Sequence, residues 1–430
     1  MRDHESKTCN EFEHLSRRNF MGISTGVMVG AMAPAWLPRV VYAQSESSSR
    51  DVIVSIFLRG GADSLSMVVP HGEDNYYDLR PTLAVPRPDS GEAKRARDLD
   101  GFFGFAHTMQ PLREAYDDGS LLVVHACGSK DPTRSHFDAM RFMEAGQGSD
   151  APSIQSGWLG RHLASVAPTS ADAVLRAVGI GAGLQRTLAG GPQTLPIADL
   201  DDFGFEGRPQ TRDDRREMPS EAYAAWDEPP RSSADNTMRT VDLLKRVGFR
   251  GYRPKGGARY PDDEFGYALK SAAALIKAEV GVEAIAIDLS GWDTHELQGN
   301  LDGHMECLTM SLAESLGAFH KDLFADDRTD FSLVVMSEFG RNVAENGSLG
   351  TDHGHGSMML AMGGGIAGGR VLTDWPGLDN GQLYDGQDLA ITIDYRDVLV
   401  EILDKRVGNS NWRAVFPDSG YSPRTQGVTI

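Results

Sequence analysis

Short apolar runs recur along the chain, and each ends near a glycine or a polar side chain. They are rich in β-branched residues, which is typical of strands buried on both faces of a sheet. The runs predict strands at Val52–Leu58, Leu121–Ala126, Ala284–Leu289, Phe331–Met336 and Met358–Met362. Between them, helical spacing of apolar residues predicts helices at Asp138–Glu144, Asp263–Val280, His304–Leu323 and Tyr395–Leu403.

Strands that alternate with helices indicate an α/β/α sandwich around a mostly parallel sheet. In such a sheet, functional groups gather on the loops at the carboxyl ends of the strands. Residues 182–262 interrupt the pattern with many Pro, Gly, Arg and Asp residues, and only Asn236–Val247 has a clear helical spacing. We therefore expect a single domain over residues 44–430, with a partly irregular insertion at about 182–262 and a smaller excursion at residues 83–104.

The first 43 residues have the organisation of an export signal. Arg17 and Arg18 precede an uncharged run at residues 22–37, and Ala43 ends a small-residue cleavage site. The run is too short for a membrane span, so an uncleaved anchor helix is the weaker interpretation. We expect recognition by the twin-arginine export machinery, a periplasmic or extracellular location, and no stable membrane span after signal removal.

Composition narrows the class of protein. The 430 residues are 40% hydrophobic and 24% charged, which is typical of a globular protein, and the net charge of −19 argues against binding to nucleic acid. Once the signal is removed, Cys127 and Cys307 remain. An oxidising compartment would permit a bridge between them, but buried free thiols are favoured because their spacing matches no disulfide pattern.

Two predicted strands are followed by groups suited to binding ions. Asp63 comes after a turn through Gly60 and Gly61, where a carboxylate can meet a metal ion, or it caps the next segment. Ser135 stands just before a predicted helix, where backbone amides and the helix dipole favour an anion and the ionised hydroxyl. A plain helix cap would have the same sequence.

A third loop combines a carboxylate with a histidine. Asp293 and His295 follow the strand Ala284–Leu289, and their spacing lets both side chains point into one site. Oxygen and imidazole ligands together suit zinc, iron or manganese.

The fourth loop is the richest in such groups. Glu338 ends one strand, and Asp352, His353 and His355 open the next. Two histidines separated by a glycine contribute little to packing, so a ligand or acid/base role is favoured over a structural one.

An ordered set of motifs resembles a known family. It comprises the twin-arginine leader and the segments Arg59–Ser64, Ser135–Ala139, Ser156–Arg161, Gly291–His295, Ser337–Arg341 and Asp352–Gly354. Together they resemble the uncharacterised family called domain of unknown function 1501, from about residue 50 to about residue 410. That family is placed in the alkaline phosphatase and sulfatase superfamily, whose members are α/β sandwiches with a metal centre at the carboxyl edge of the sheet.

The resemblance implies roles for residues already singled out. Asp63 matches the superfamily's metal-binding carboxylate after the first strand, and Ser135 stands where the superfamily has its nucleophile. Asp293 and His295 are similar to its Asp-X-X-X-His metal pair, although they are closer in sequence.

The fourth loop departs from the superfamily's pattern. Glu338 and Phe339 stand where the resemblance implies an Asp-His pair of metal ligands, and His353 or His355 matches the late histidine. Asp352 and the two histidines compensate for the missing ligand, or a single metal binds.

Two functions follow from the resemblance. The first is an exported hydrolase of phosphate or sulfate esters, acting on a small-molecule or glycan substrate and using a divalent metal such as zinc, manganese or calcium. Ser135 or a metal-bound water would attack, and Arg134 or Arg341 would stabilise charge on the transferred group. The second is a non-catalytic envelope binding or accessory protein on the same scaffold. The candidate metal ligands are Asp63, Asp293, His295, Glu338, Asp352, His353 and His355.

Overall fold

The structure is a computed structural model that describes residues 50–151, 153–170, 173–200, 203 and 230–430. The export signal predicted at residues 1–43 lies outside the described residues, as does most of the segment 201–229 within the predicted insertion.

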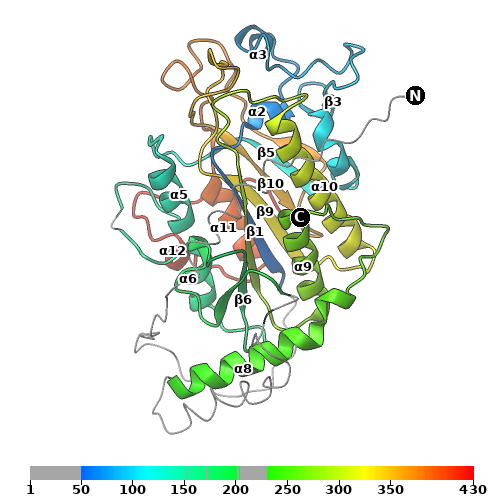
Figure 1. The fold of residues 1–430 in the computed structure, drawn as a ribbon. Helices are drawn as coiled ribbons and strands as arrows, with labels where there is room; N and C mark the ends of the chain where they lie inside the picture. The colour runs from blue at the N-terminus through cyan, green and yellow to red at the C-terminus, as the bar shows by residue number, and fades with distance from the viewer. Residues whose placement is uncertain (1–49, 152, 171–172, 201–202, 204–229) are drawn as a thin grey trace, which may run out of the picture.

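A nine-stranded sheet forms the centre of the molecule (Figure 1). Its strands, in spatial order, are β11 (Arg370–Leu372), β5 (Leu121–Gly128), β10 (Ser357–Met362), β9 (Phe331–Ser337), β1 (Val52–Arg59), β8 (Ala284–Ser290), β6 (Ala177–Ile180) and β7 (Thr194–Ile197), with β12 (Ile393–Asp394) paired to β5. Every neighbouring pair is parallel except the two that involve β10, which runs antiparallel to β5 and β9. The predicted α/β fold with a mostly parallel sheet is confirmed.

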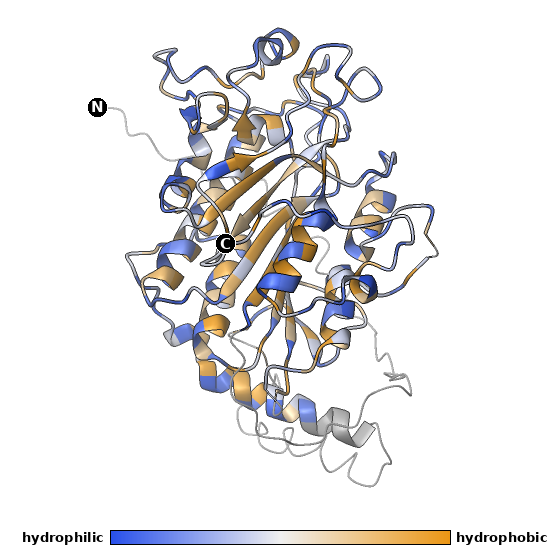
Figure 2. Cartoon of the chain, turned by 180° about the vertical axis from the view of Figure 1, so that it is seen from behind, coloured by the Kyte–Doolittle hydropathy of each residue, from blue (hydrophilic) through white to orange (hydrophobic). Residues whose placement is uncertain are grey.

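Helices cover both faces of this sheet. One face packs against α9 (Glu264–Ala278) and α10 (His304–Phe324), and the other against α5 (His136–Ala145), α6 (Trp158–Ser165), α11 (Tyr395–Lys405) and α12 (Trp412–Val415). Because side chains of a strand alternate between faces, Val54 and Ile56 of β1 enter the core with α9 and α10. Ile53 and Phe57 enter the other core. Figure 2 shows the central strands as hydrophobic along most of their length.

Smaller elements surround the central sheet. A three-stranded antiparallel sheet is formed by β2 (Val68–Val69), β4 (Gly104–Phe105) and β3 (Arg97–Asp98), so part of the excursion predicted at 83–104 is built around it. The other helices within the described residues are α2 (Ser64–Met67), α3 (Asp74–Leu79), η1 (His107–Leu112), α4 (Arg113–Asp117), η2 (Arg186–Leu188), α8 (Pro230–Val247) and η4 (Phe249–Gly251).

The range predicted as an insertion is not wholly separate from the sheet. Strand β7 lies within residues 182–262 and pairs with β6 through parallel hydrogen bonds. Helix α8 contains the predicted helix Asn236–Val247 and lies at the opposite end of the molecule from α3 (Figure 1).

The predicted strands and helices occur where the apolar spacing placed them, with ends shifted by a few residues. Capping explains the helix starts: the Asp263 carboxylate accepts a hydrogen bond from Gly266 N at 2.7 Å and begins α9. Ser135 begins α5 in the same way, and Gly146 ends that helix in a left-handed conformation.

Two further expectations concern thiols and membranes. Cys127 is a buried free thiol, as expected, so the bridge between Cys127 and Cys307 does not form. The expectation of a free thiol is wrong for Cys307, which is disulfide-bonded. Among the described residues, no helix has both the length and the apolar character needed to cross a bilayer.

Candidate metal centre

Four loops meet at one edge of the central sheet. Strands β1, β5, β8 and β9 are mutually parallel, so their carboxyl ends lie at this edge. Strand β10 runs the other way and therefore begins there. The loops after β1, β8 and β9, the segment before β10 and the start of α5 are thereby brought together.

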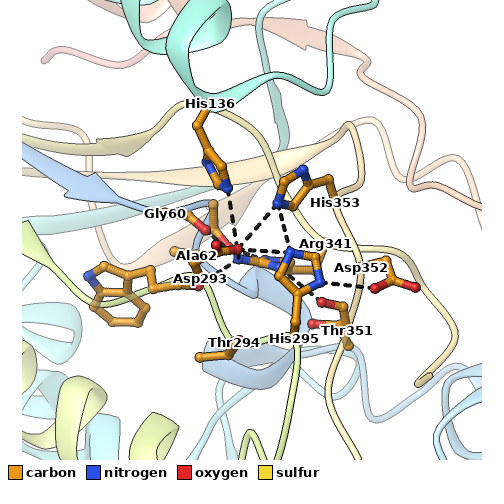
Figure 3. Close-up of polar contacts among 12 residues, drawn as sticks. Gly60, Ala62, His136, Asp293, Thr294, His295, Arg341, Thr351, Asp352 and His353 are labelled. Atoms are coloured by element: carbon orange, nitrogen blue, oxygen red, sulfur yellow. Dashed lines mark hydrogen bonds and ion pairs between the residues drawn. The ribbon is translucent and has the colours of Figure 1, made fainter. Parts of the chain in front are cut away.

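Three histidines surround one carboxylate oxygen at this edge (Figure 3). The Nε2 atoms of His295, His353 and His136 lie 3.0, 3.2 and 3.3 Å from Asp293 Oδ1. Ligand atoms of His136, Asp293 and His353 all lie within 4.8 Å of one another. About half of the Asp293 side chain (49%) is exposed, so the cluster is open to solvent. We call these four residues the histidine–aspartate cluster.

Each histidine is held at its other ring nitrogen by an oxygen. Nδ1 of His136 lies 2.8 Å from Glu338 Oε1, and Nδ1 of His295 lies 2.9 Å from Asp352 Oδ1. Nδ1 of His353 lies 2.8 Å from the carbonyl oxygen of Arg134. A carbonyl or carboxylate oxygen only accepts, so each Nδ1 carries a proton, and the Nε2 atom of each ring faces Asp293.

This donor set fits a divalent metal ion. Nε2 of His136 is buried and makes no hydrogen bond to any described residue. Nε2 of His295 and Nε2 of His353 lie only 2.9 Å apart, where two lone pairs repel unless a proton or a cation lies between them. Ligand atoms about 2.0–2.1 Å from a tetrahedral zinc ion lie about 3.3–3.4 Å from one another, close to the spacings of the cluster.

Arg341 lies beneath the cluster and is fully buried. Its guanidinium donates to the carbonyl oxygens of Gly60, Gly61, Trp292 and Thr351, and to Asp293 Oδ1 at 2.7 Å. These acceptors belong to three of the four loops, so Arg341 ties the loops together. With so many acceptors already bound, it is placed to position Asp293 rather than to contact a transferred group.

Arg341 also controls the charge of Asp293. Burial would raise the pKa of the Asp293 carboxyl, but the hydrogen bond and the positive charge of Arg341 outweigh it and lower the pKa to about 2. The carboxylate is therefore ionised at neutral pH. For His136, the hydrogen bond to Glu338 raises the pKa, so metal binding there would displace a proton.

The floor of the cluster is apolar. The Phe339 ring lies 4.9 Å from the rings of both His136 and His353, measured between centroids. Gly61 passes so close to Phe339 that a Cβ there would lie 2.6 Å from the ring. Phe339 thus supports two imidazoles at the position where the superfamily resemblance implies a further ligand.

Several residues predicted from sequence belong to the support of the cluster. Glu338 is buried and accepts from Gly60 N at 2.8 Å as well as facing His136. Asp352 faces His295 in the same way. Both carboxylates act on a histidine ring rather than entering the group of mutually close ligand atoms.

Asp63 has a different partner from the one expected. It is fully buried, and both of its oxygens bind the Arg80 guanidinium, at 2.6 and 3.0 Å. Ser66 Oγ and Gln298 Nε2 also donate to it. The Arg80 charge outweighs burial and lowers the Asp63 pKa. The structure does not bring Asp63 into the cluster.

His355 also lies apart from the cluster. Its ring stacks on Tyr384, with centroids 4.1 Å apart, and burial lowers the His355 pKa to about 4. Arg134 pairs with Asp388 at 2.6 Å and with Asp385 at 3.1 Å, so its guanidinium is engaged, while its carbonyl holds His353.

Ser135 caps α5 and is exposed, 3.5 Å from Asp138 N. It lies between Arg134, whose carbonyl oxygen holds His353, and His136, a member of the cluster. Sequence reasoning singled out Ser135 and overlooked His136, the next residue. The sequence did contain a signal for His136. A residue directly after a helix N-cap lies at the same sheet edge as the cap, so a histidine there is also a candidate ligand.

Fold and site together define an α/β sandwich protein with a candidate metal centre at the carboxyl edge of its sheet. The chain belongs to the family described as "Protein of unknown function (DUF1501)", which matches residues 50–414. The resemblance found in the sequence is confirmed. A search of curated proteins finds no match.

Solved structures similar to the chain include sulfatases and a periplasmic domain. The C-terminal periplasmic domain of Escherichia coli EptC, solved with Zn, shares 12% identity over 76% of this chain and 77% of that one, with a TM-score of 0.33. A putative sulfatase from Bacteroides thetaiotaomicron shares 10% identity over 87% and 76%, with a TM-score of 0.32. A 2-O GAG sulfatase shares 10% over the same fractions, with a TM-score of 0.30.

Proposed function

We propose that the protein is an exported, metal-dependent hydrolase of phosphate or sulfate esters. The observation that carries the proposal is the convergence of three Nε2 atoms on Asp293 Oδ1, with every Nδ1 held by an oxygen. Such an arrangement is typical of a metal centre whose ligands are fixed by their outer hydrogen bonds. The export signal predicted at residues 1–43 supports a periplasmic or extracellular location.

His136, Asp293 and His353 would hold the metal, with His295 as a fourth ligand. Imidazole and carboxylate donors favour zinc or manganese over calcium, which prefers oxygen ligands. A divalent cation supplies Lewis acidity toward an ester oxygen. Glu338 and Asp352 keep two ring protons on Nδ1, while Arg341 keeps Asp293 ionised and the Phe339 ring packs against His136 and His353.

Ser135 remains the candidate nucleophile. Its exposed hydroxyl stands at the start of α5, between two residues that contact the cluster. Backbone amides at a helix start favour the negative charge that an attacking oxygen or a bound anion carries. Small-molecule and glycan esters are both substrates to test.

The decisive experiment combines metal analysis with an activity panel. Purified mature protein should carry about one zinc or manganese per chain and hydrolyse at least one ester of a phosphate and sulfate panel. Metal stripping should abolish the activity, and adding the metal back should restore it. His353→Ala should lose both metal and activity, whereas His71→Gln, in the segment beside the small sheet, should retain them. A metal-free protein inert toward every ester would overturn the proposal.

One observation favours a second candidate, a non-catalytic envelope binding protein. Both arginines expected to stabilise a transferred group are already paired, Arg341 beneath the cluster and Arg134 with Asp388. This candidate predicts no stoichiometric metal and the same thermal stability with and without a chelator.

A further inference from the structure

Two exposed leucines lie on the loops that carry His295 and its partner Asp352. Among the residues that the structure describes, the large apolar side chains exposed to solvent are Phe137, Leu184, Leu297, Met310, Leu349 and Ile430. Leu297 is 71% exposed and follows His295 by two residues. Leu349 is 45% exposed and precedes Asp352, the residue that holds His295, by three.

The loops that carry the two leucines are joined by hydrogen bonds. Leu297 N donates to Ser348 O at 2.9 Å, and Gln298 N donates to Leu349 O at 2.8 Å. Asn346 adds a link, because its Nδ2 donates to the carbonyl of His295 at 2.9 Å and to Asp352 Oδ1 at 3.1 Å. These hydrogen bonds hold the backbones of Leu297 and Leu349 next to each other and tie both loops to His295 and Asp352.

Local backbone preference does not explain leucine at either position. Leu297 has φ +45° and Leu349 has φ +58°, in the left-handed region where glycine and asparagine are favoured. Nor does burial explain them, since both face solvent. Two exposed leucines in an unfavourable conformation, side by side at the edge of a candidate catalytic site, point to contact with a ligand.

We propose that Leu297 and Leu349 determine specificity, by contacting the apolar organic group of the ester whose anionic group is held at the cluster. The substrate class is then an aryl or alkyl ester rather than a small polar one. This inference rests on the proposed hydrolase function. Two side chains offer far less than the roughly 800 Å² per partner of a stable protein interface. The net charge of −19 also disfavours an anionic membrane surface.

The test measures binding without turnover, using benzylphosphonate and methylphosphonate, which carry the same anionic group and cannot be hydrolysed. Isothermal titration of the metal-loaded mature protein should show at least about fivefold tighter binding of benzylphosphonate, because its ring buries apolar surface. Replacing both leucines, Leu297→Asn with Leu349→Asn, should remove this preference and leave methylphosphonate binding unchanged. Asparagine tolerates the left-handed conformation, so the variant should melt at the same temperature or slightly higher.

A control variant separates this contact from general surface hydrophobicity. Leu184 is 41% exposed on another loop, so Leu184→Asn should keep the full preference for benzylphosphonate. Equal binding of the two phosphonates by the unmodified protein would overturn the inference but not the hydrolase. If the double variant still binds benzylphosphonate more tightly than methylphosphonate, the inference is likewise overturned and the hydrolase function is not. Binding of neither phosphonate would overturn the inference, and the metal analysis and ester panel would then decide separately whether the hydrolase function stands.

Discussion

Asp293 is the residue on which the site depends. One of its oxygens receives Arg341 from below and faces the Nε2 atoms of three histidines from the solvent side. An ionised carboxylate can bridge a buried guanidinium and a metal because each oxygen has more than one acceptor direction. The chemistry of the site therefore comes from side chains that keep Asp293 charged and hold the three Nε2 atoms against it.

Glu338 tests whether the outer hydrogen bonds tune the metal site. In Glu338→Gln the amide oxygen can still accept from His136, but the negative charge that makes the ring a stronger ligand is lost. Zinc affinity should fall about 10- to 100-fold, the usual cost of changing such a partner. Competition with a chromophoric chelator measures the affinity directly.

Glu314→Gln is the matched control, since Glu314 is exposed on α10. It should bind zinc as the unmodified protein does. If Glu338→Gln also binds zinc with unchanged affinity, Glu338 does not tune the site through His136. Melting temperatures in chelator will show whether either change damages the fold itself.

At the scale of elements, the direction of β10 assembles the site. The sequence predicted both β9 and β10, together with a mostly parallel sheet. In a fully parallel sheet, the start of β10 would lie at the opposite edge from the end of β9. The connection between these strands contains no helix, and they pair as antiparallel neighbours, which brings His353 to the edge where Asp293 lies.

Glycine lets these loops approach one another closely. A Cβ on Gly350 would lie 2.2 Å from the carbonyl oxygen of His295, which is far inside contact distance. Gly350→Ala should therefore push the His295 loop away from Asp352. We expect at least about tenfold weaker zinc binding and a loss of stability of about 1–3 kcal/mol, as for other overpacked positions.

Gly347→Ala is the control, because it adds the same methyl group to the same loop with no atom within 4 Å. Its stability should stay within about 0.5 kcal/mol of the unmodified protein. Zinc titration and chemical denaturation of both variants check the prediction. Equal zinc affinity in the two variants would show that the loop spacing at Gly350 does not shape the site.

For the whole molecule, regular spacing made the fold predictable, and long-range pairing made parts of the site unpredictable. Apolar runs mark β1, β5, β8, β9 and β10 because buried strands need them. Asp63 follows a strand, as a metal ligand would. Its actual partner, Arg80, lies 17 residues further along the chain, and no sequence pattern predicts that they pair. His355 shares a motif with His353 but stacks on Tyr384, a contact that only the folded chain reveals.

Buried histidines give the whole molecule a dependence on pH. His162 and His125 are inaccessible to solvent. Burial, helped by the charge of Arg176, lowers the pKa of His162 to about 3, and burial lowers the pKa of His125 to about 4. The unfolded chain has histidine pKa values near 6.5. As the pH falls below that value, the unfolded chain takes up protons that the folded chain does not, so the free energy of unfolding falls.

His162→Gln removes one of these titrating groups, so comparing the variant with the unmodified protein gives the contribution of His162 to the pH dependence of the free energy of unfolding. For each such histidine, the free energy of unfolding should fall by up to about 1.4 kcal/mol per pH unit on acidification. Between pH 6.5 and 5, the variant's unfolding free energy should therefore depend on pH less steeply by that amount. Between pH 8 and 9 the two proteins should have the same slope, because His162 is neutral in both states there. Urea denaturation across the two windows measures the slopes, whatever the absolute cost of the substitution. Identical slopes from pH 6.5 to 5 would mean that folded His162 takes up its proton as readily as the unfolded chain does.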